Sequence, residues 1–274
     1  MNSRLGRSII NLSAVESAWR LHLVRLIRAL YRWGQPLFDP VRTFDAACKY
    51  LPYLADLVHY TRMPGAETLR LINSYPRLDG STAATPFDSH YFYQDIWAFK
   101  AIKASGTPSH VDVGSRVIFV GMLTAITKVT FIDIRPLIVN LENFDSKPGS
   151  ILALPFGDNS VPSLSCLHVA EHIGLGRYGD PLDPEGTKKA ARELARVLAP
   201  RGNLYFSVPV GKPRVCFNAH RIHSPEQILD YFYDLELVQF SGIEDDGTFR
   251  QDMAPSDLAD ATYACGLFHF TKKP

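Results

Sequence analysis

The chain has 274 residues, of which 46% are hydrophobic and 21% are charged, and its formal net charge is +1. These values lie close to the average for globular proteins, so they exclude a disordered, collagen-like or coiled-coil chain. The near-zero charge also argues against a protein built mainly to bind nucleic acid, which needs a dense basic surface.

The chain begins with a basic segment, in which seven arginines up to Arg42 face only Glu16 and Asp39. Apolar residues recur at helical spacing in this segment, at Val15, Trp19, Leu23, Ile27 and Leu30. We therefore predict a basic amphipathic helix over 13–33. This helix either packs on the main domain or makes a peripheral contact with an anionic membrane or a protein partner. A second helix is predicted from Val41 to Tyr60.

From His110 onward, predicted strands alternate with predicted helices, which is typical of a parallel sheet with crossover helices. The strands are predicted at 110–115, 128–134, 163–170, 203–210, 235–243 and 263–273. The helices are predicted at 184–198 and 225–233. We divide the chain into an N-terminal helical segment, 1–74, and one domain, 75–274.

The cysteines and the apolar runs indicate where the protein resides. The cysteines stand far apart without a C-x-x-C pair, at Cys48, Cys166, Cys216 and Cys265. This pattern predicts reduced thiols in a cytoplasmic protein. No apolar run approaches the ~20 residues of a membrane helix, and the first residues lack the pattern of a secretory signal.

Four stretches in the right order resemble the class I S-adenosylmethionine-dependent methyltransferases. "VDVGS" (111–115) is similar to their first glycine motif, and "FIDI" (131–134) to the acidic end of their second strand. "LPFGDNSVPSLSCLHVAEHI" (154–173) is similar to the stretch that leads into the fourth strand. "ARELARVLAPRGNLYFSVP" (191–209) is similar to the helix and strand that follow. At finer grain, residues 75–272 resemble an uncharacterised family with a methyltransferase-like fold, domain of unknown function 268.

The resemblance implies an α/β fold with a Rossmann-like, doubly wound sheet. The sheet should be mostly parallel with an antiparallel closing strand, and the N-terminal helices are an addition to it. The cofactor implied is S-adenosyl-L-methionine, bound at the carboxyl ends of the first strands.

Two of the implied cofactor residues also have a physical rationale. Gly114 directly follows a strand and lets the backbone approach a nucleoside without a Cβ in the way. Asp133 ends the next strand. A carboxylate there can accept hydrogen bonds from both hydroxyls of a ribose, or else from backbone N–H groups of the turn that follows. The cofactor-binding residues that the resemblance implies are Asp112, Gly114, Ser115, Arg116, Asp133 and Leu154.

The sequence departs from the family pattern at two places. Arg116 and Ile118 occupy positions where the first motif usually has glycines. Arg116 either crowds the site or turns outward to form a salt bridge or to hold the methionine carboxylate. Ser150 lies nearest the position where the family often has an acidic residue that binds the amino group of adenine. These departures favour the alternative of a catalytically degenerate domain that binds or scaffolds.

The stretch from His168 to His172 reads H-x-x-E-H, the signature of one class of zinc peptidase. Such a site needs a helix, so that residues four apart share a face, and it needs a third ligand. Glycines and prolines between Gly174 and Pro184 would end a helix within two turns. We therefore expect no metal site, and a zinc hydrolase is only a remote alternative.

His168, Glu171 and His172 are instead candidate catalytic residues on a loop over the crevice, unless His172 only hydrogen-bonds the loop. The aromatic stretch 87–97 is predicted to form a helix over the cleft, where it contacts substrate or packs in the core. In "FNAHRIHSP" (217–225), His220 and its neighbours either recognise an anionic or sugar substrate or solvate a loop.

The resemblance, taken with these residues, implies an S-adenosylmethionine-dependent methyltransferase that acts on a small molecule or glycan. Methyl transfer needs chiefly in-line positioning of the acceptor. If the acceptor is a hydroxyl, the base would be His172, Glu171 or His220.

Overall fold

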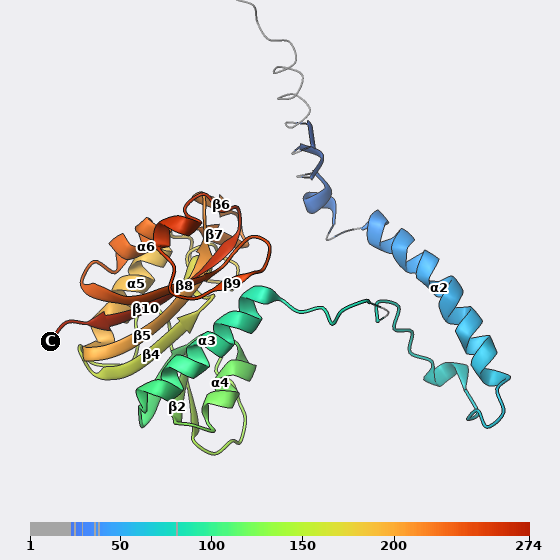
Figure 1. Cartoon of the computed structure of the whole chain (residues 1–274), viewed down its shortest axis with the longest axis horizontal. Coiled ribbons are helices and arrows are strands. Elements are labelled where there is room, and N and C mark those ends of the chain that lie inside the picture. Colours follow the sequence, from blue (N-terminus) through green and yellow to red (C-terminus); the bar gives the residue numbers. More distant parts are fainter. Residues whose placement is uncertain (1–22, 25, 29, 36, 38, 81) are drawn as a thin grey trace, which may run out of the picture. The chain divides into compact units, whose positions relative to one another are not determined.

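The chain divides into two compact units, residues 1–86 and 87–274 (Figure 1). The boundary expected from the sequence, between 74 and 75, stays a prediction. The computed structural model describes residues 23–24, 26–28, 30–35, 37, 39–80 and 82–274. The basic helix predicted over 13–33 lies mostly outside these residues, although those of its last turns that are described are helical.

In the first unit, α2 (Pro40–Thr61) corresponds to the helix predicted over 41–60. The Asp39 carboxylate caps it by accepting a hydrogen bond from the Arg42 N–H at 3.0 Å, and proline suits the first turn. A short 3-10 helix, η1 (Leu71–Asn73), follows. None of the helices in the described part of the chain is both long and apolar enough to cross a membrane.

The second unit is built on an eight-stranded sheet in the order β3-β2-β1-β4-β5-β10-β8-β9. Neighbouring strands from β3 to β5 are parallel, and β10 pairs antiparallel with both β5 and β8. This confirms the predicted doubly wound sheet with an antiparallel closing strand. The strands are β1 (Ser109–Val113), β2 (Lys128–Asp133), β3 (Phe144–Pro148), β4 (Val161–Leu167), β5 (Leu198–Val210), β8 (Leu235–Ile243), β9 (Phe249–Arg250) and β10 (Ala264–Lys272).

Helices cover both faces of the sheet because successive strand residues point to opposite sides. On β5, Tyr205 belongs to the core under α3 and α4, whereas Phe206 belongs to the core under α5 and α6. The two layers of helices are visible on either side of the sheet in Figure 1. The helices are α3 (Ser89–Ser105), α4 (Val117–Leu123), η2 (Ala170–His172), α5 (Gly186–Val197), α6 (Pro225–Tyr231) and η3 (Pro255–Leu258), and the hairpin β6 (Arg214–Cys216) with β7 (His220–Ile222) lies outside the main sheet.

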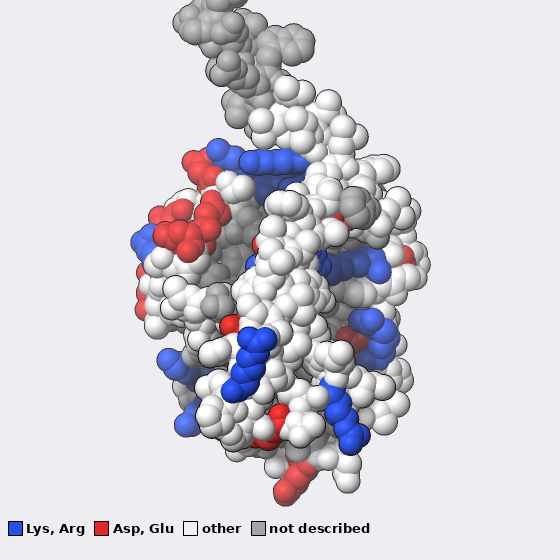
Figure 2. All heavy atoms as spheres, turned by 90° about the vertical axis from the view of Figure 1, so that its right-hand side faces the viewer, with Lys and Arg blue, Asp and Glu red and all other residues white. Residues whose placement is uncertain are grey.

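Charged side chains of both signs are interspersed over the face of the molecule that Figure 2 shows. This distribution accords with a formal net charge of +1 for the whole sequence.

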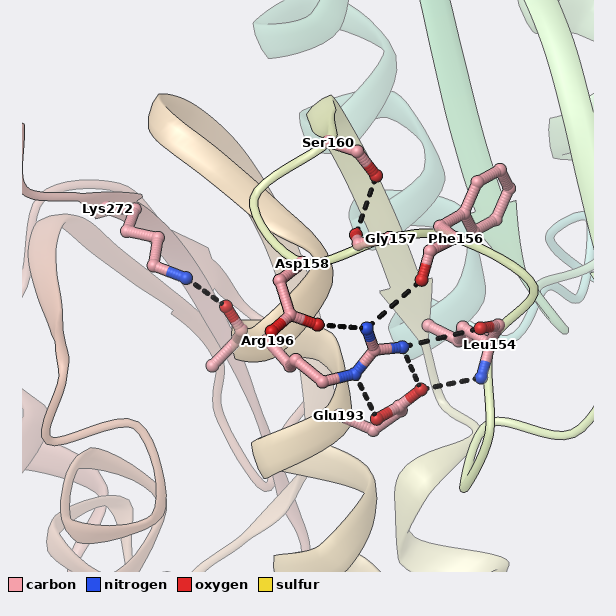
Figure 3. A network of polar contacts seen from close by, with 9 residues as sticks. Leu154, Phe156, Gly157, Asp158, Ser160, Glu193, Arg196 and Lys272 are labelled. Atoms are coloured by element: carbon pink, nitrogen blue, oxygen red, sulfur yellow. Dashed lines mark hydrogen bonds and ion pairs between the residues drawn. The ribbon is translucent and has the colours of Figure 1, made fainter.

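Arg196 on α5 holds the "LPFGD" segment that precedes β4 (Figure 3). Its guanidinium forms a two-bonded ion pair with Glu193, with distances of 2.8 and 2.6 Å, and a 2.6 Å bond to Asp158. It also donates to the carbonyls of Phe156 at 3.1 Å and Leu154 at 3.4 Å. The segment is therefore fixed by a planar fork of donors that lysine cannot reproduce.

We expect Arg196→Lys to lower the free energy of unfolding by about 1–2 kcal/mol, because the bonds to the two carbonyls and one bond to Glu193 are lost. Arg192→Lys, an exposed position on the same helix, is the matched control and should change little. Urea denaturation of both variants measures the difference. Equal stabilities of the two variants would show that the fork contributes nothing.

Candidate functional site

The order of the parallel strands reverses between β1 and β4. The chain runs from β1 outward to β2 and β3, then crosses to β4 and β5 on the other side. In open α/β sheets, ligands bind in the crevice outside the carboxyl ends of the strands at such a point. A crevice of about 120 Å³ lies here, lined by the ends of β1 and β2, by Gly149 and Ile151, and by the loop that follows β4.

Gly114 and Asp133 meet in this crevice. Gly114 has a φ of 70°, which glycine adopts without strain. A Cβ at this position would lie 3.1 Å from Val169 Cγ1 and 3.7 Å from Asp133 Oδ2. Asp133 Oδ1 accepts a hydrogen bond from the Arg135 N–H at 2.7 Å, whereas Oδ2 receives none from the described residues. Asp133 Oδ2 can therefore accept a hydrogen bond from a ligand.

Asp112 and Ser115 lie beneath the turn instead of on the crevice wall. The buried Asp112 carboxylate accepts hydrogen bonds from the Ser115 N–H at 3.0 Å and from the Ser165 hydroxyl. Ser115 Oγ in turn accepts from the Leu167 N–H at 3.0 Å. Burial raises the pKa of Asp112 to about 6, although its hydrogen bonds oppose the rise. Both residues thus tie the turn after β1 to β4.

His110 fills the space between β1 and β4. Its Nδ1 and Nε2 each lie 2.8 Å from a serine hydroxyl, of Ser163 and Ser165 respectively. Burial lowers the pKa of His110 to about 3, whereas an unfolded histidine titrates near about 6.5. Because the folded-state pKa is depressed, the stability from this group is present above about 6.5 and is lost as the pH falls towards about 3.

We expect His110→Asn to make the free energy of unfolding less dependent on pH between about 3 and 6.5. In that window, unfolding of the unsubstituted protein takes up a proton at His110, which adds a slope of up to about 1.4 kcal/mol per pH unit. Asp112, whose pKa is raised, acts with the opposite sign below about 6 and remains in both proteins. Urea denaturation at several pH values measures the slope, and equal slopes would contradict a buried neutral His110.

Arg116 and Leu154 lie outside the crevice. The Arg116 guanidinium lies 3.7 Å from the Asp95 carboxylate and 4.8 Å from the ring centroid of Tyr91, both on α3. Of the alternatives for Arg116, the structure therefore has the outward one. Leu154 is buried in the core that faces α5, and Ile151 from the same segment reaches the crevice instead.

The H-x-x-E-H stretch leaves β4 in a sharp turn. His168 has a φ of 55°, and Glu171 and His172 belong to the three-residue helix η2. His168 and His172 therefore do not share one face of a helix, as the zinc peptidase arrangement requires. His168 and His172 both line the crevice, and Glu171 is fully buried beside them.

Glu171 and His172 form a buried acid–base pair. Neither carboxyl oxygen of Glu171 has a hydrogen-bond partner in the described chain, and burial raises the pKa of Glu171 to about 8. His172 Nδ1 donates to the Ala219 carbonyl at 2.6 Å, which leaves Nε2 unprotonated, 3.6 Å from Glu171 Oε1. Burial lowers the pKa of His172 to about 4. At neutral pH, therefore, the imidazole and not the carboxyl is the group that can accept a proton.

A second cavity, of about 590 Å³, meets the crevice at His168, which lines both. Its other walls are residues 87–91 at the start of α3, the loop 244–247 and Tyr263. The ring centroid of Tyr263 lies 5.1 Å from those of both His90 and His220. His220 thus contacts a wall residue of the cavity but is not part of its lining.

Tyr178 and Arg135 also line the crevice, and neither was expected there from the sequence. The Arg135 guanidinium carbon lies 5.0 Å from the Tyr178 ring centroid, and that of Arg177 lies 5.2 Å from it. Such cation–aromatic contacts are attractive. Arg135 lies two positions after Asp133, so its place near the end of β2 could be predicted from the sequence. Its contact with Tyr178 could not, because no sequence pattern links the two residues.

The strand order and the antiparallel β10 define a class I methyltransferase-like fold, as the sequence motifs predicted. The family described as "Caenorhabditis protein of unknown function, DUF268" matches residues 151–258, from the crevice segment through β4, α5 and β8. The comparison with curated proteins gave no match.

Solved structures, several of them described as methyltransferases, are similar to this chain. The YcgJ protein of Bacillus subtilis is 15% identical, with 67% of this chain and 99% of that chain covered and a TM-score of 0.48. The N-methyltransferase NodS of Bradyrhizobium japonicum, in complex with S-adenosyl-L-homocysteine, is 14% identical, with 67% and 87% covered and a TM-score of 0.48. A putative sarcosine dimethylglycine methyltransferase of Galdieria sulphuraria is 14% identical, with 66% and 86% covered and a TM-score of 0.47.

Proposed function

We propose that the protein is an S-adenosylmethionine-dependent methyltransferase that acts on a small molecule or glycan. The observation that carries the proposal is that one residue, His168, lines both cavities. One contains Gly114 and Asp133 at the switch point of the sheet, and the other has room for an acceptor. Methyl transfer requires the two reactants to be held in line, and adjoining cavities suit that requirement.

The lining of the crevice fits the nucleoside part of S-adenosylmethionine. Asp133 Oδ2 would accept the ribose hydroxyls, and Ile151 and Val169 would give apolar walls. The volume of about 120 Å³ is less than the roughly 300–1,000 Å³ of small-molecule pockets, so we infer that Tyr178 leaves Arg135 when the cofactor enters. The bound cofactor would supply a methyl group on a positively charged sulfur, which becomes a neutral thioether after the transfer.

We assign His172, which lines the crevice and not the acceptor cavity, as the base for a hydroxyl acceptor whose reacting oxygen reaches the crevice. Its Nε2 is unprotonated at neutral pH, because Nδ1 is committed to the Ala219 carbonyl. Glu171 is mostly a neutral acid at that pH and cannot take the proton, but it can hydrogen-bond the imidazolium that forms.

Calorimetric titration of the full-length protein with S-adenosylmethionine and S-adenosylhomocysteine tests cofactor binding. We expect saturable binding of both compounds and a rise in Tm, whereas the control nucleotide NAD should give neither. Transfer of a labelled methyl group to a panel of sugars, alcohols and amines then tests activity. If neither compound binds, the proposal of a methyltransferase is wrong, and a catalytically degenerate domain that binds or scaffolds is the function to test next.

A further inference from the structure

Three side chains that can bind a metal ion meet beside the proposed acceptor cavity. They are His90 from α3, His168 from the turn after β4 and Cys265 from β10, and all three are buried. One ring nitrogen of each histidine and the cysteine sulfur lie within 4.8 Å of one another. The three residues come from distant parts of the sequence, so no sequence motif predicts that they lie together.

The second observation is an unsatisfied nitrogen on His168. Gln94 Oε1 lies 2.6 Å from His168 Nδ1 and also accepts a hydrogen bond from the Ser207 hydroxyl at 2.6 Å. Since Gln94 Oε1 is an acceptor, Nδ1 carries the proton and Nε2 carries a lone pair. Nε2 is buried and has no hydrogen-bond partner among the described residues. Metal-binding histidines commonly donate their other N–H to an oxygen acceptor. Gln94 therefore holds the His168 ring in the way that such an acceptor holds a metal-binding histidine.

Glu171, a neutral acid in the metal-free chain, would balance the charge of a buried metal ion by giving up its proton. A divalent ion with two neutral imidazoles and one thiolate keeps a net charge of +1, which is unfavourable in the interior unless it is balanced. Neither carboxyl oxygen of Glu171 has a partner in the described part of the chain.

We propose that His90, His168 and Cys265 bind a Zn²⁺ ion. Zinc prefers nitrogen and sulfur ligands at about 2.0–2.3 Å, which places ligand atoms of a tetrahedral site roughly 3.3–3.8 Å apart. The observed separations of up to 4.8 Å therefore require side-chain shifts of about 1 Å. This set replaces the H-x-x-E-H stretch as the zinc candidate and shares only His168 with it.

Three protein ligands leave one position open, as in catalytic zinc sites. His90 and His168 also line the cavity that we assign to the acceptor. An acceptor oxygen or sulfur in that cavity would be within reach of the open position, where zinc would favour its deprotonated form. This role rests on the proposed function, whereas zinc binding by the three residues does not.

Titration of the reduced, full-length protein with Co²⁺ in the absence of S-adenosylmethionine tests the site. We expect one Co²⁺ per chain, a thiolate-to-cobalt charge-transfer band in the near ultraviolet, and displacement by Zn²⁺. Cys265→Ser should remove the charge-transfer band, and His90→Ala should weaken Zn²⁺ binding more than about 100-fold. Gln94→Ala, which removes the acceptor of the His168 Nδ1–H, should weaken it by about 10–100-fold.

Cys166→Ser is the matched control, because Cys166 is equally buried but belongs to the core on the opposite face of the sheet. It should leave the cobalt spectrum unchanged, and circular dichroism shows that each variant folds. No charge-transfer band in the unsubstituted protein overturns the proposal, as does a band that survives Cys265→Ser. If Cys265→Ser does not fold, unchanged Zn²⁺ affinity in His90→Ala overturns it instead. Calorimetry of S-adenosylmethionine in a chelating buffer keeps the outcome for the proposed function separate.

Discussion

Asp133→Ala is expected to weaken S-adenosylmethionine binding at least about 100-fold and to leave the protein folded. Asp133 Oδ2 points into the crevice beside Gly114 and receives no hydrogen bond from the described residues. A hydrogen bond to a charged group is worth about 1.5–3 kcal/mol, so the loss of two ribose bonds amounts to about 3 kcal/mol or more. Calorimetric titration measures the change in affinity, and thermal melts establish that the variant is folded.

Asp145→Ala is the matched control for this experiment. Asp145 lies on the neighbouring strand β3, where its carboxylate is half-exposed and lies 3.1 Å from Lys147. Its removal should leave cofactor affinity as it is. Normal binding by Asp133→Ala would mean that the cofactor site lies elsewhere, even though the fold is that of a methyltransferase.

His172→Ala is expected to lower turnover by about 10²–10⁴-fold with cofactor affinity nearly unchanged. The imidazole lines the crevice, and its Nε2 is free to take a proton at neutral pH. The methyl-transfer rate with an acceptor identified from the panel measures turnover, and calorimetry measures affinity. A large loss of affinity would instead assign His172 to the cofactor site.

Glu171→Gln separates the two members of the acid–base pair. Burial holds Glu171 largely neutral at pH 7, so a neutral amide of the same shape should preserve most of the activity, with a loss below about tenfold. A loss as large as that of His172→Ala would make the carboxyl, and not the imidazole, the essential base. The rates of Glu171→Gln and His172→Ala are compared at one pH near 7, where Glu171 is mostly neutral and His172 is unprotonated in the unsubstituted protein.

The main strands could be predicted because their side chains are buried on both faces. β2, β5 and β10 are runs of apolar and aromatic residues, as strands covered by helices on either side must be. β3 was missed because its sequence, Phe144–Pro148, is polar. In the described sheet it is an edge strand paired with β2 alone, so most of its side chains face solvent. Apolar patterning gives no signal for a strand of this kind.

The part of the site that could be predicted is the part set by strand ends. Gly114 and Asp133 each follow or end a strand, and the carboxyl ends of adjacent parallel strands meet at one edge. Leu154 could not be placed, because Glu193 accepts its N–H at 2.6 Å and draws its segment towards α5. The second cavity could not be predicted either, since it brings together residues from the start of α3, the loop 244–247 and Tyr263, which only the folded chain makes neighbours.

The position of β10 has a consequence for how the chain folds. β10 is the last strand of the sheet in sequence order, yet it lies between β5 and β8 and pairs with both. Any intermediate that forms before β10 docks must therefore leave the edges of β5 and β8 open. Open strand edges template pairing with other chains, and pairings between distant segments form slowly.

The proposed zinc site can form only after β10 has docked. Cys265 arrives on β10 and Tyr263 immediately precedes that strand, so neither the metal ligands nor the wall of the acceptor cavity exist in an intermediate that lacks it. Metal present during refolding would bind only the completed sheet, and mass action would then favour the last docking step. Refolding yield at micromolar protein concentration should therefore rise with Zn²⁺, and Cys265→Ser should remove that gain.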